Sequence, residues 1–268
     1  MVITELLNDA PEPSTTNNSK TNRIEISLLT ASLNEVKNIQ IWLERISTLY
    51  FSNKIKEIKE LVIVDDGSKD GTLDEIIKAK KDYPIPIKLI QRNIKTGTLN
   101  AQIVGTVSCE YEHVLIMDCD LQHPTEFIPD FIQRLESDPD IIIGSRYVKG
   151  GTNDWPAYRG VVSRIATFLS HILLKNSRKI KDPLSGYFLI RKNLLTSLTP
   201  YEGMYKPLLF AISMSTTRKV IEIPVRMEQR NYGKSKIVTN PVMVIFRYIR
   251  EILIFWISVR KKMSRAKQ

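Results

Sequence analysis

The stretch Leu61-Val-Ile-Val64, followed by Asp65-Asp-Gly-Ser-Lys-Asp-Gly71, decides the fold. Four consecutive apolar residues without alternation predict a strand that is covered on both faces, as in a parallel sheet. The Asp, Gly and Ser residues that follow are turn formers, and they lead into a predicted helix over 72–81. A buried strand that turns directly into a helix is the repeating unit of an α/β fold.

The same unit recurs on both sides of this stretch. Strands are predicted at 24–29, 87–90, 114–117 and 140–143, and helices at 35–50, at 98–108 and from Pro124 onward. Beyond Gly144 the alternation loosens into a loop at 146–156, a helix near 157–175, a strand near 186–190, helices near 192–197 and 205–215, a strand at 219–223 and a loop through 239. The predicted fold class is therefore α/β, with a Rossmann-like, mainly parallel sheet flanked by helices.

The two ends of the chain differ in composition from the middle. Residues 1–22 hold a Ser/Thr/Asn run and no long apolar stretch, which predicts a disordered tail rather than a signal peptide. Residues 240–259 are predicted to form a mostly apolar helix, interrupted by charges and followed by a basic tail. That helix is too short and too charged to span a bilayer comfortably, so we expect it to lie in the membrane interface. An ordinary core helix is the alternative. The predicted domains are thus a tail at 1–22, one folded domain over 23–239 and an amphipathic membrane-interface segment at 240–268.

The overall charge narrows the class of partner. The 268 residues carry 39 Lys and Arg against 29 Asp and Glu, a formal charge of +10. A basic chain suggests nucleic acid, a lipid surface or phosphate groups. The sequence contains no helix-turn-helix, zinc or RNP string, so we expect no nucleic-acid partner. The two cysteines, Cys109 and Cys119, are too few for a disulfide framework and are expected to be reduced thiols.

Acidic residues follow three of the predicted strands. Asp118-Cys-Asp120-Leu-Gln122 leaves the strand at 114–117, Asp65-Asp66 follows 61–64, and Asn34-Glu35 follows 24–29. Ligands of open α/β sheets bind beyond the carboxyl ends of the strands, so these side chains are predicted to meet there. Two carboxylates and an amide at alternate positions suit a hard cation such as Mg²⁺ or Mn²⁺. Each string alone also fits turn or capping chemistry, but together the acids would repel one another without a cation or ligand between them.

Basic residues in the second half of the chain complement these acids. Arg146 lies in a Gly-Ser-Arg-Tyr string, and Arg159 precedes Ser163 by four residues. Arg230 and Lys236 bound the string Arg-Asn-Tyr-Gly-Lys-Ser-Lys. The planar guanidinium fork of arginine matches the geometry of phosphate oxygens, so these residues are candidates for holding phosphate groups.

Six strings taken together resemble a known family. The chain resembles the polyprenyl-phosphate glycosyltransferases of the GT-A type, and within them the dolichyl-phosphate mannose synthases, from about Ile24 to Ile237. The strings that carry this resemblance occur in order and are Ala31-Ser-Leu-Asn-Glu35, Val64-Asp-Asp-Gly-Ser-Lys-Asp-Gly-Thr72, Met117-Asp-Cys-Asp-Leu-Gln-His-Pro124, Gly144-Ser-Arg-Tyr-Val-Lys-Gly-Gly151, Asp182-Pro-Leu-Ser-Gly-Tyr187 and Tyr232-Gly-Lys-Ser-Lys236. The first string departs from the usual Pro-Thr-Tyr-Asn-Glu of the family, and Gly97-Thr-Leu replaces its usual Gly-Leu-Gly.

The resemblance implies an inverting sugar transfer from a nucleotide sugar, GDP-mannose more than UDP-glucose, to a polyprenyl or dolichyl phosphate. It also implies a GT-A fold, a Mg²⁺ or Mn²⁺ ion and a location on the cytoplasmic face of a membrane. By motif position, Asp118, Asp120 and Gln122 would hold the metal, and Arg146, Arg159 and Ser163 would hold the acceptor phosphate. The donor would be bound by Asn34, Glu35, Asp65, Asp66, Asp118, Arg230 and Lys236, with Asp120 and Arg230 acting in catalysis. A dolichyl-phosphate glucosyltransferase, or a non-catalytic protein that binds nucleotides or nucleic acid, is the alternative. Partner subunits are left open.

Overall fold

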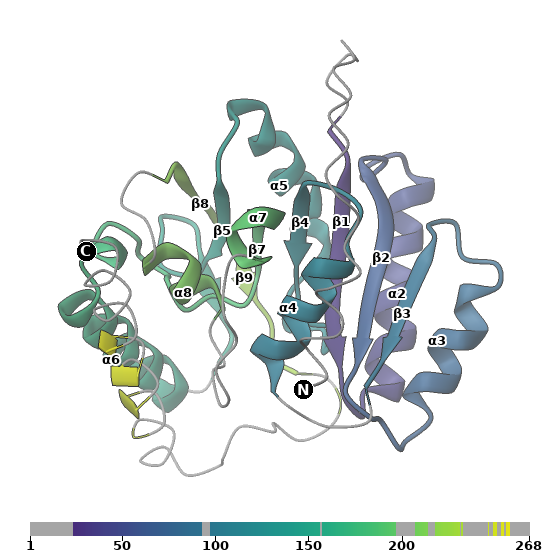
Figure 1. Cartoon of the computed structure of the whole chain (residues 1–268), viewed down its shortest axis with the longest axis horizontal. Coiled ribbons are helices and arrows are strands. Elements are labelled where there is room, and N and C mark those ends of the chain that lie inside the picture. Colours follow the sequence, from purple (N-terminus) through teal and green to yellow (C-terminus); the bar gives the residue numbers. More distant parts are fainter. Residues whose placement is uncertain are drawn as a thin grey trace, which may run out of the picture.

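The sheet is the centre of the molecule (Figure 1). The computed structural model describes residues 24–92, 97–155, 157–196, 207–213 and 218–230, together with 232, 246, 249–250, 253–254 and 256–257. Within these residues a seven-stranded sheet has the order β3-β2-β1-β4-β7-β5-β8. All of its strands run parallel except β7, which is antiparallel to both of its neighbours. The predicted α/β class and mainly parallel sheet are confirmed.

Apart from α5, the strands and α-helices of the described residues begin and end within three residues of their predicted ends. The strands are β1 (Ile26–Ser32), β2 (Ile58–Asp65), β3 (Ile87–Gln91), β4 (His113–Ile116), β5 (Ile141–Ser145), β7 (Phe188–Arg191) and β8 (Val220–Pro224). The α-helices are α2 (Val36–Phe51), α3 (Thr72–Lys80), α4 (Thr98–Ser108), α5 (Ile128–Arg134), α6 (Ala157–Leu173), α7 (Lys192–Thr196) and α8 (Pro207–Ser213). Short 3₁₀ turns are η1 (Thr125–Phe127), η2 (Leu135–Ser137) and η3 (Lys175–Ser177).

Two predicted loops each contain a short strand. Strand β6 (Thr152–Asn153) pairs in parallel with strand β9 (Arg226–Met227), and the two form a separate two-stranded sheet. The sequence predicts loops at both places, one at 146–156 and one through 239. Two residues are too few to show a period of alternation, so only the tertiary pairing defines them. The helix predicted from Pro124 is also corrected. It is a single α-helical stretch between two 3₁₀ turns, and it ends at Asp138, whose φ is 53°.

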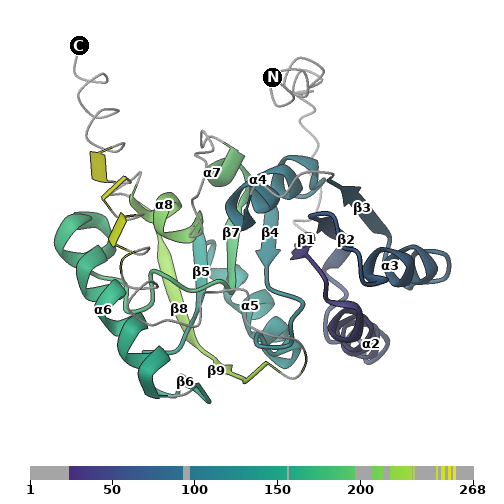
Figure 2. The same ribbon diagram turned by 90° about the horizontal axis from the view of Figure 1, so that it is seen from below.

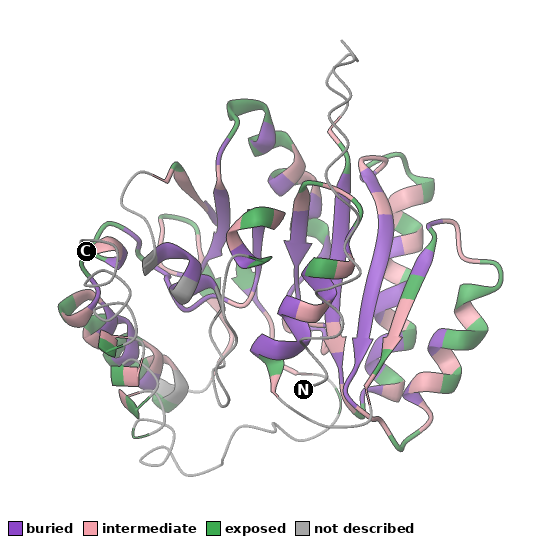
Figure 3. Cartoon of the chain, viewed as in Figure 1, coloured by how far each residue is buried: buried purple, intermediate pink, exposed green. Residues whose placement is uncertain are grey.

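Alternate residues of the central strands pack into two different cores. Leu28 belongs to the cluster under α2, α3 and α5, whereas Leu29 belongs to the cluster under α4, α7 and α8. Successive side chains of a strand point to opposite faces, so a continuous apolar run fills both layers. Figure 2 shows the two helical layers on either side of the sheet, and Figure 3 shows that the central strands are buried.

The reversed direction of β7 follows from where the chain enters it. Asp182, which precedes β7, is bonded to Arg146 just past the end of β5. The chain therefore starts β7 at the carboxyl edge of the sheet and runs back across it, antiparallel to β5. Tyr187, at the turn into β7, accepts a backbone hydrogen bond from Gly144 at 2.9 Å.

Both cysteines lie within the described residues. Cys109 and Cys119 are both buried free thiols, as predicted, and burial raises the pKa of Cys109 to about 12.

The C-terminal segment is described only in part. Of residues 240–268 the structure describes seven, all helical, among which Ile254 and Trp256 pack against the protein core. The rest of this segment and residues 1–23 lie outside the described residues. Within the described part of the chain, none of the helices has the length and apolar character needed to cross a membrane.

Gly105 sets how closely α4 can approach the sheet. A Cβ at this position would lie 2.3 Å from Cδ1 of Leu29 and 3.0 Å from Cγ2 of Val64, both fully buried. The close packing of α4 on β1 and β2 therefore depends on the absence of a side chain at this position. Gly160, on α6, is the opposite case, because a Cβ there would meet nothing within 4 Å.

We therefore expect opposite effects of enlarging these two glycines. Gly105→Val should reduce the free energy of unfolding by about 1–3 kcal/mol, because the core must move to admit it. Gly160→Ala should increase it by about 0.4–1 kcal/mol, because alanine loses less entropy in a helix. Urea unfolding followed by circular dichroism measures both. An unchanged stability for Gly105→Val would show that α4 can move away from the sheet.

Candidate functional site

The acidic residues meet at the carboxyl edge of the sheet, as predicted. Glu35 lies three residues beyond β1, Asp65 is the last residue of β2, and Asp118 lies two residues beyond β4. Because β1 lies between β2 and β4, these three strand ends are adjacent. From β1 the chain continues to β2 and β3 on one side of β1, and then returns to form β4 on its other side. The point between β1 and β4 is therefore a switch point, where open α/β sheets bind ligands.

Arg230 joins two of these acidic positions. Its Nη2 forms a short ion pair with Oε1 of Glu35, and its Nη1 lies 3.8 Å from Oδ2 of Asp120. Its Nε donates to the carbonyl oxygen of Tyr232 at 2.8 Å. Burial works to lower the pKa of Arg230, but the hydrogen bond and charge of Glu35 outweigh it and raise the pKa. A permanent positive charge is thus fixed between two carboxylates that are 195 and 110 residues away in sequence.

Glu35 is itself held in place on both sides. Its Oε2 accepts a hydrogen bond from Nδ2 of Asn38 at 2.7 Å, and its backbone N–H donates to Oγ1 of Thr72 at 2.8 Å. The residue is only 7% exposed. A buried carboxylate with this many partners keeps the guanidinium of Arg230 in one orientation.

The turn after β4 carries the predicted metal ligands Asp118, Asp120 and Gln122. Leu121 adopts a φ of 66°, a left-handed conformation that costs a non-glycine residue about 1–2 kcal/mol. The backbone N–H of Gln122 donates to Oδ1 of Asp120 at 3.1 Å, and its side-chain nitrogen donates to the carbonyl of Glu228 at 3.4 Å. These two hydrogen bonds hold the strained turn in place, and the turn carries three oxygen-bearing side chains within five residues.

This set of donors fits a hard divalent cation that shares its coordination with a ligand. Burial and then the nearby charge of Asp118 raise the pKa of Asp120 to about 6, and a cation beside both carboxylates would relieve that repulsion. Among the residues that the structure describes, no three His, Cys, Asp or Glu side chains form a group that could hold a metal ion alone. Mg²⁺ is usually bound in proteins by one or two carboxylates, with substrate phosphates and water completing the shell.

His123 is a positioning residue that the sequence reasoning did not select. Its Nδ1 accepts a hydrogen bond from the backbone N–H of Asp118 at 2.8 Å, and its ring stacks on Tyr187 with centroids 5.2 Å apart. Since Nδ1 is an acceptor, the proton of the neutral ring is on Nε2, which lies 3.8 Å from Oδ2 of Asp118. The sequence does contain a signal for this residue, because His123 belongs to the string Met117–Pro124, one of the six that carry the family resemblance.

Asp65 organises the loop that follows β2. Its Oδ1 accepts hydrogen bonds from the backbone N–H groups of Gly67 and Ser68 at 3.1 and 2.9 Å. Its Oδ2 accepts from the hydroxyl of Ser32 at 3.0 Å and from that of Ser68. The predicted contact of Asp65 with a nucleoside would therefore use a carboxylate that already has four donors within the protein.

Asn34 and Asp66 lie beside the same loop. Asn34, with a φ of 52°, receives the backbone N–H of Lys69 on its Oδ1 at 2.8 Å and donates its own N–H to Ser68 at 2.9 Å. Asp66 is paired with Arg92, whose Nε lies 3.3 Å from Oδ1. These two predicted donor-binding residues are thus brought to the site, where they shape its wall through the loop 66–71.

The predicted acceptor residue Arg146 is buried in an ion pair. Its Nε and Nη2 donate to the two carboxylate oxygens of Asp182 at 2.7 and 2.6 Å. Its guanidinium lies 4.7 Å from the ring of Trp155 and 5.0 Å from that of Tyr147. Tyr147 in turn bonds the hydroxyl of Ser163, on α6, at 2.9 Å. The structure thus connects Arg146 to Ser163 through Tyr147, and Asp182 is a second residue that sequence reasoning did not select.

Two predicted site residues cannot be placed. The side chain of Arg159 and the whole of Lys236 lie outside the described residues. The backbone of Arg159 is helical within α6, one turn before Ser163, which agrees with the predicted helix.

A mainly parallel sheet with an acidic cluster at its switch point and a fixed arginine beside it is the arrangement expected of a GT-A fold. The model of glycosyl transferase family 2 matches residues 27–198, which is more than half of the chain. The protein belongs to glycosyl transferase family 2.

Several relatives share a narrower description. A dolichol-phosphate mannosyltransferase of Pyrococcus furiosus is 34% identical over 231 residues, which cover 85% of this chain and 63% of that protein. The chain therefore spans less than two thirds of the length of that relative. The dolichol-phosphate mannosyltransferases of Mycosarcoma maydis and Saccharomyces cerevisiae are each 28% identical, with 77% and 88% of their lengths covered.

Solved structures confirm the fold. Glucosyl-3-phosphoglycerate synthase from Mycobacterium tuberculosis superposes with a TM-score of 0.63 at 18% identity, covering 88% of this chain and 79% of that one. Mannosyl-3-phosphoglycerate synthase from Rubrobacter xylanophilus gives a TM-score of 0.64 at 15% identity, with 85% and 73% covered. At these identities the likeness shows the GT-A fold alone.

The role of His123 gives a prediction for metal binding. Replacing His123 by alanine removes the acceptor of the Asp118 N–H and the stack on Tyr187, so the turn should lose its orientation. Replacing a residue that orients a metal ligand typically weakens metal binding 10- to 100-fold. We expect Mn²⁺, measured by electron paramagnetic resonance, to bind His123→Ala about 10- to 100-fold more weakly. His113→Ala, at the opposite end of β4, is the control. Equal Mn²⁺ affinity of the two variants would exclude the positioning role.

Proposed function

We propose that this protein transfers mannose from GDP-mannose to a polyprenyl or dolichyl phosphate, with inversion at the anomeric carbon. The observation that carries the proposal is the ion pair of Arg230 with Asp120, two residues from Asp118, at the switch point of a GT-A fold. It is supported by the three relatives described as dolichol-phosphate mannosyltransferases. The product would be a β-linked lipid-phosphate sugar.

A divalent ion would be held by Asp118 and Asp120, with the amide oxygen of Gln122 as a further ligand. Such an ion stabilises the negative charge that develops on a nucleotide-diphosphate leaving group. The neighbouring structure from Mycobacterium tuberculosis, described in complex with Mn²⁺ and UDP, supports Mn²⁺ as a suitable ion for this fold.

Arg230 would act on the same leaving group. Its guanidinium is already fixed by Glu35, so little reorganisation is needed when charge develops on the diphosphate. The ion pair also means that Arg230 enters the reaction permanently charged. Glu35, Asn34 and Asp66 would then support the nucleoside end of the donor, and Lys236 would add a second positive charge.

The acceptor needs no strong general base. A phosphate monoester has a second pKa of about 6, so it is mostly ionised at neutral pH and can attack the anomeric carbon directly. What it needs is groups that hold one anion against another, which in this proposal are the cations Arg146 and Arg159 and the hydroxyl of Ser163. Because the acceptor carries a long isoprenoid chain, the site would work at the cytoplasmic face of a membrane, with residues 240–268 in the interface.

A donor and metal screen tests the activity. We expect GDP-mannose with a short polyprenyl phosphate to be turned over in Mn²⁺ or Mg²⁺, no turnover in chelator, and recovery when metal returns. Asp120→Ala should lower kcat/KM by about 30- to 1,000-fold, whereas Asp82→Ala, an exposed acid far from the site, should not. Turnover of UDP-glucose alone would assign the glucosyl alternative. A folded protein that turns over neither donor would point to a non-catalytic nucleotide-binding protein.

A second experiment separates the donor from the acceptor. Arg159→Ala should raise the KM for the lipid phosphate by about tenfold or more while GDP-mannose binding stays the same, because a charged hydrogen bond contributes about 1.5–3 kcal/mol. Arg159→Lys should recover only part of the loss, since lysine lacks the bidentate fork. Calorimetry of each ligand provides the measurement. Loss of donor binding with an unchanged acceptor would mean that the two sites are reversed.

A further inference from the structure

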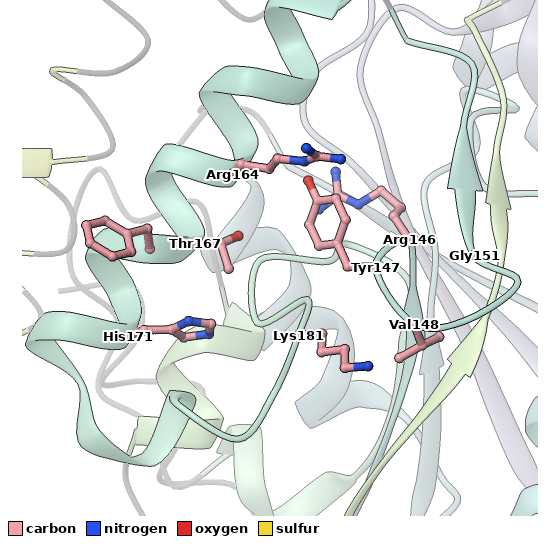
Figure 4. A pocket seen from close by; sticks show the side chains of 9 residues that line it. Arg146, Tyr147, Val148, Gly151, Arg164, Thr167, His171 and Lys181 are labelled. Atoms are coloured by element: carbon pink, nitrogen blue, oxygen red, sulfur yellow. The ribbon is translucent and has the colours of Figure 1, made fainter.

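A cavity of about 440 Å³ lies between α6 and the loop that follows β5. Figure 4 shows Arg164, Thr167 and His171 projecting into it from α6, with Tyr147 and Val148 on the opposite wall and Lys181 at one side. Its volume is within the range of small-molecule sites, which is about 300–1,000 Å³. It is separate from the cluster of Glu35, Asp120 and Arg230, none of which lines it.

The lining of the cavity is basic. Arg146, Arg164 and Lys181 contribute to it together with His171, and no acidic side chain is among the lining residues. Arg146 is neutralised by Asp182, but Arg164 and Lys181 are exposed, and neither forms an ion pair with another described residue. An uncompensated pair of cations around a concave surface attracts an anion.

Thr167 gives an independent sign of a ligand. The residue is only 8% exposed, and its Oγ1 has no hydrogen-bond partner among the described residues. In Figure 4 the side chain points from α6 into the cavity between Arg164 and Lys181. A buried hydroxyl without a partner costs about 1–3 kcal/mol, and a rotation of this side chain about χ1 would turn its enclosed Oγ1 towards the cavity, where a ligand can bond it. A phosphate oxygen accepts such a bond while its charge meets the two cations.

The surface next to the cavity is apolar, which indicates the source of the phosphate. Five exposed side chains follow one another at helical spacing along α6, and these are Tyr158, Val161, Ile165, Phe168 and Ile172. At 100° per residue they form one stripe, and Phe168, which also lines the cavity, is at its border. Positions 158 and 172 are 14 residues apart, so the stripe is about 21 Å long. A ligand with a phosphate head and an apolar chain fits both surfaces together.

We propose that this cavity is a lipid-phosphate site held by Arg164, Lys181 and the hydroxyl of Thr167, with the chain of the lipid beside the stripe on α6. The proposal rests on the proposed transfer to a lipid phosphate and adds residues outside the predicted set of Arg146, Arg159 and Ser163. Contact is continuous between the two, because Tyr147 lines the cavity and also bonds Ser163. The phosphate belongs either to the polyprenyl acceptor or to an anionic phospholipid of the membrane.

Direct binding measurements test the site without relying on turnover. The probes are inorganic phosphate, farnesyl phosphate, and vesicles of phosphatidylcholine with and without phosphatidylglycerol. We expect the pair Arg164→Gln and Lys181→Gln to weaken farnesyl phosphate binding by about tenfold or more, since each charged hydrogen bond contributes at least that factor. The matched control is Lys179→Gln, which removes an exposed charge six residues beyond the end of α6 and not among the residues that line the cavity.

Thr167 supplies a readout that a purely structural role would not give. Thr167→Val should weaken farnesyl phosphate binding while the melting temperature stays the same or rises, because the variant removes an unpaired buried hydroxyl. Thr167→Ser, which keeps the hydroxyl, should retain binding. A parallel fall in binding and melting temperature for both variants would show that Thr167 acts in packing and would overturn its assignment.

The probes also separate the two sources and the two proposals. Weaker binding of farnesyl phosphate assigns the site to the acceptor, and weaker binding only of phosphatidylglycerol vesicles assigns it to membrane phospholipid. Unchanged binding of both, or binding of inorganic phosphate alone, would overturn the lipid-phosphate site. If the wild-type protein binds farnesyl phosphate through these residues but transfers no mannose from GDP-mannose, the proposed function fails and the site stands.

Discussion

The crowding of acidic side chains at one edge of the sheet is the constraint on which the rest of the structure depends. Parallel strands place their carboxyl ends together, so Glu35, Asp65 and Asp118 are neighbours although they come from distant parts of the chain. Carboxylates so arranged raise one another's pKa values unless something positive lies between them. The pKa of Asp120 is raised to about 6 by burial first and then by the charge of Asp118. The fold must therefore bring cations or hydrogen-bond donors to this edge, and it does so in two ways.

On the side of β2, groups of the protein itself compensate the negative charge of the acidic residues. The loop after β2 surrounds Asp65 with four donors, and Arg92 pairs with Asp66. On the other side, Arg230 arrives from beyond β9 and is shared between Glu35 and Asp120. The first arrangement is complete within the protein. The second leaves the turn from Asp118 to Gln122 for the cation and the diphosphate of the proposed reaction.

The half of the chain after β5 follows a different principle. Arg146 and Asp182 form a buried, bidentate ion pair covered by Trp155 and Tyr147, and breaking such a pair is costly because it leaves a buried charge. This pair fixes where β7 begins and hence its reversed direction. It also places the loop from Tyr147 to Gly151 against α6, and between them lies the basic cavity with its unpaired threonine. Arg146, which is predicted to bind the acceptor phosphate, therefore also has a structural role in its ion pair with Asp182. The exposed Arg164 and Lys181 beside it are the cations that remain for a ligand.

The sequence by itself determined the strand-helix alternation, the parallel class of the sheet and the gathering of acids at its edge. Continuous apolar runs such as Leu61–Val64 encode strands covered on both faces, and strand direction then follows from the helices between them. The sequence could not reveal the reversal of β7 or the pairing of β6 with β9. Each depends on contacts between residues far apart in the chain, as when Asp182 meets Arg146 across 36 positions. Local periodicity carries no record of such contacts. Tertiary structure alone decided which cations are already neutralised and which still face a cavity, because charge compensation depends on distance in space and not on order along the chain.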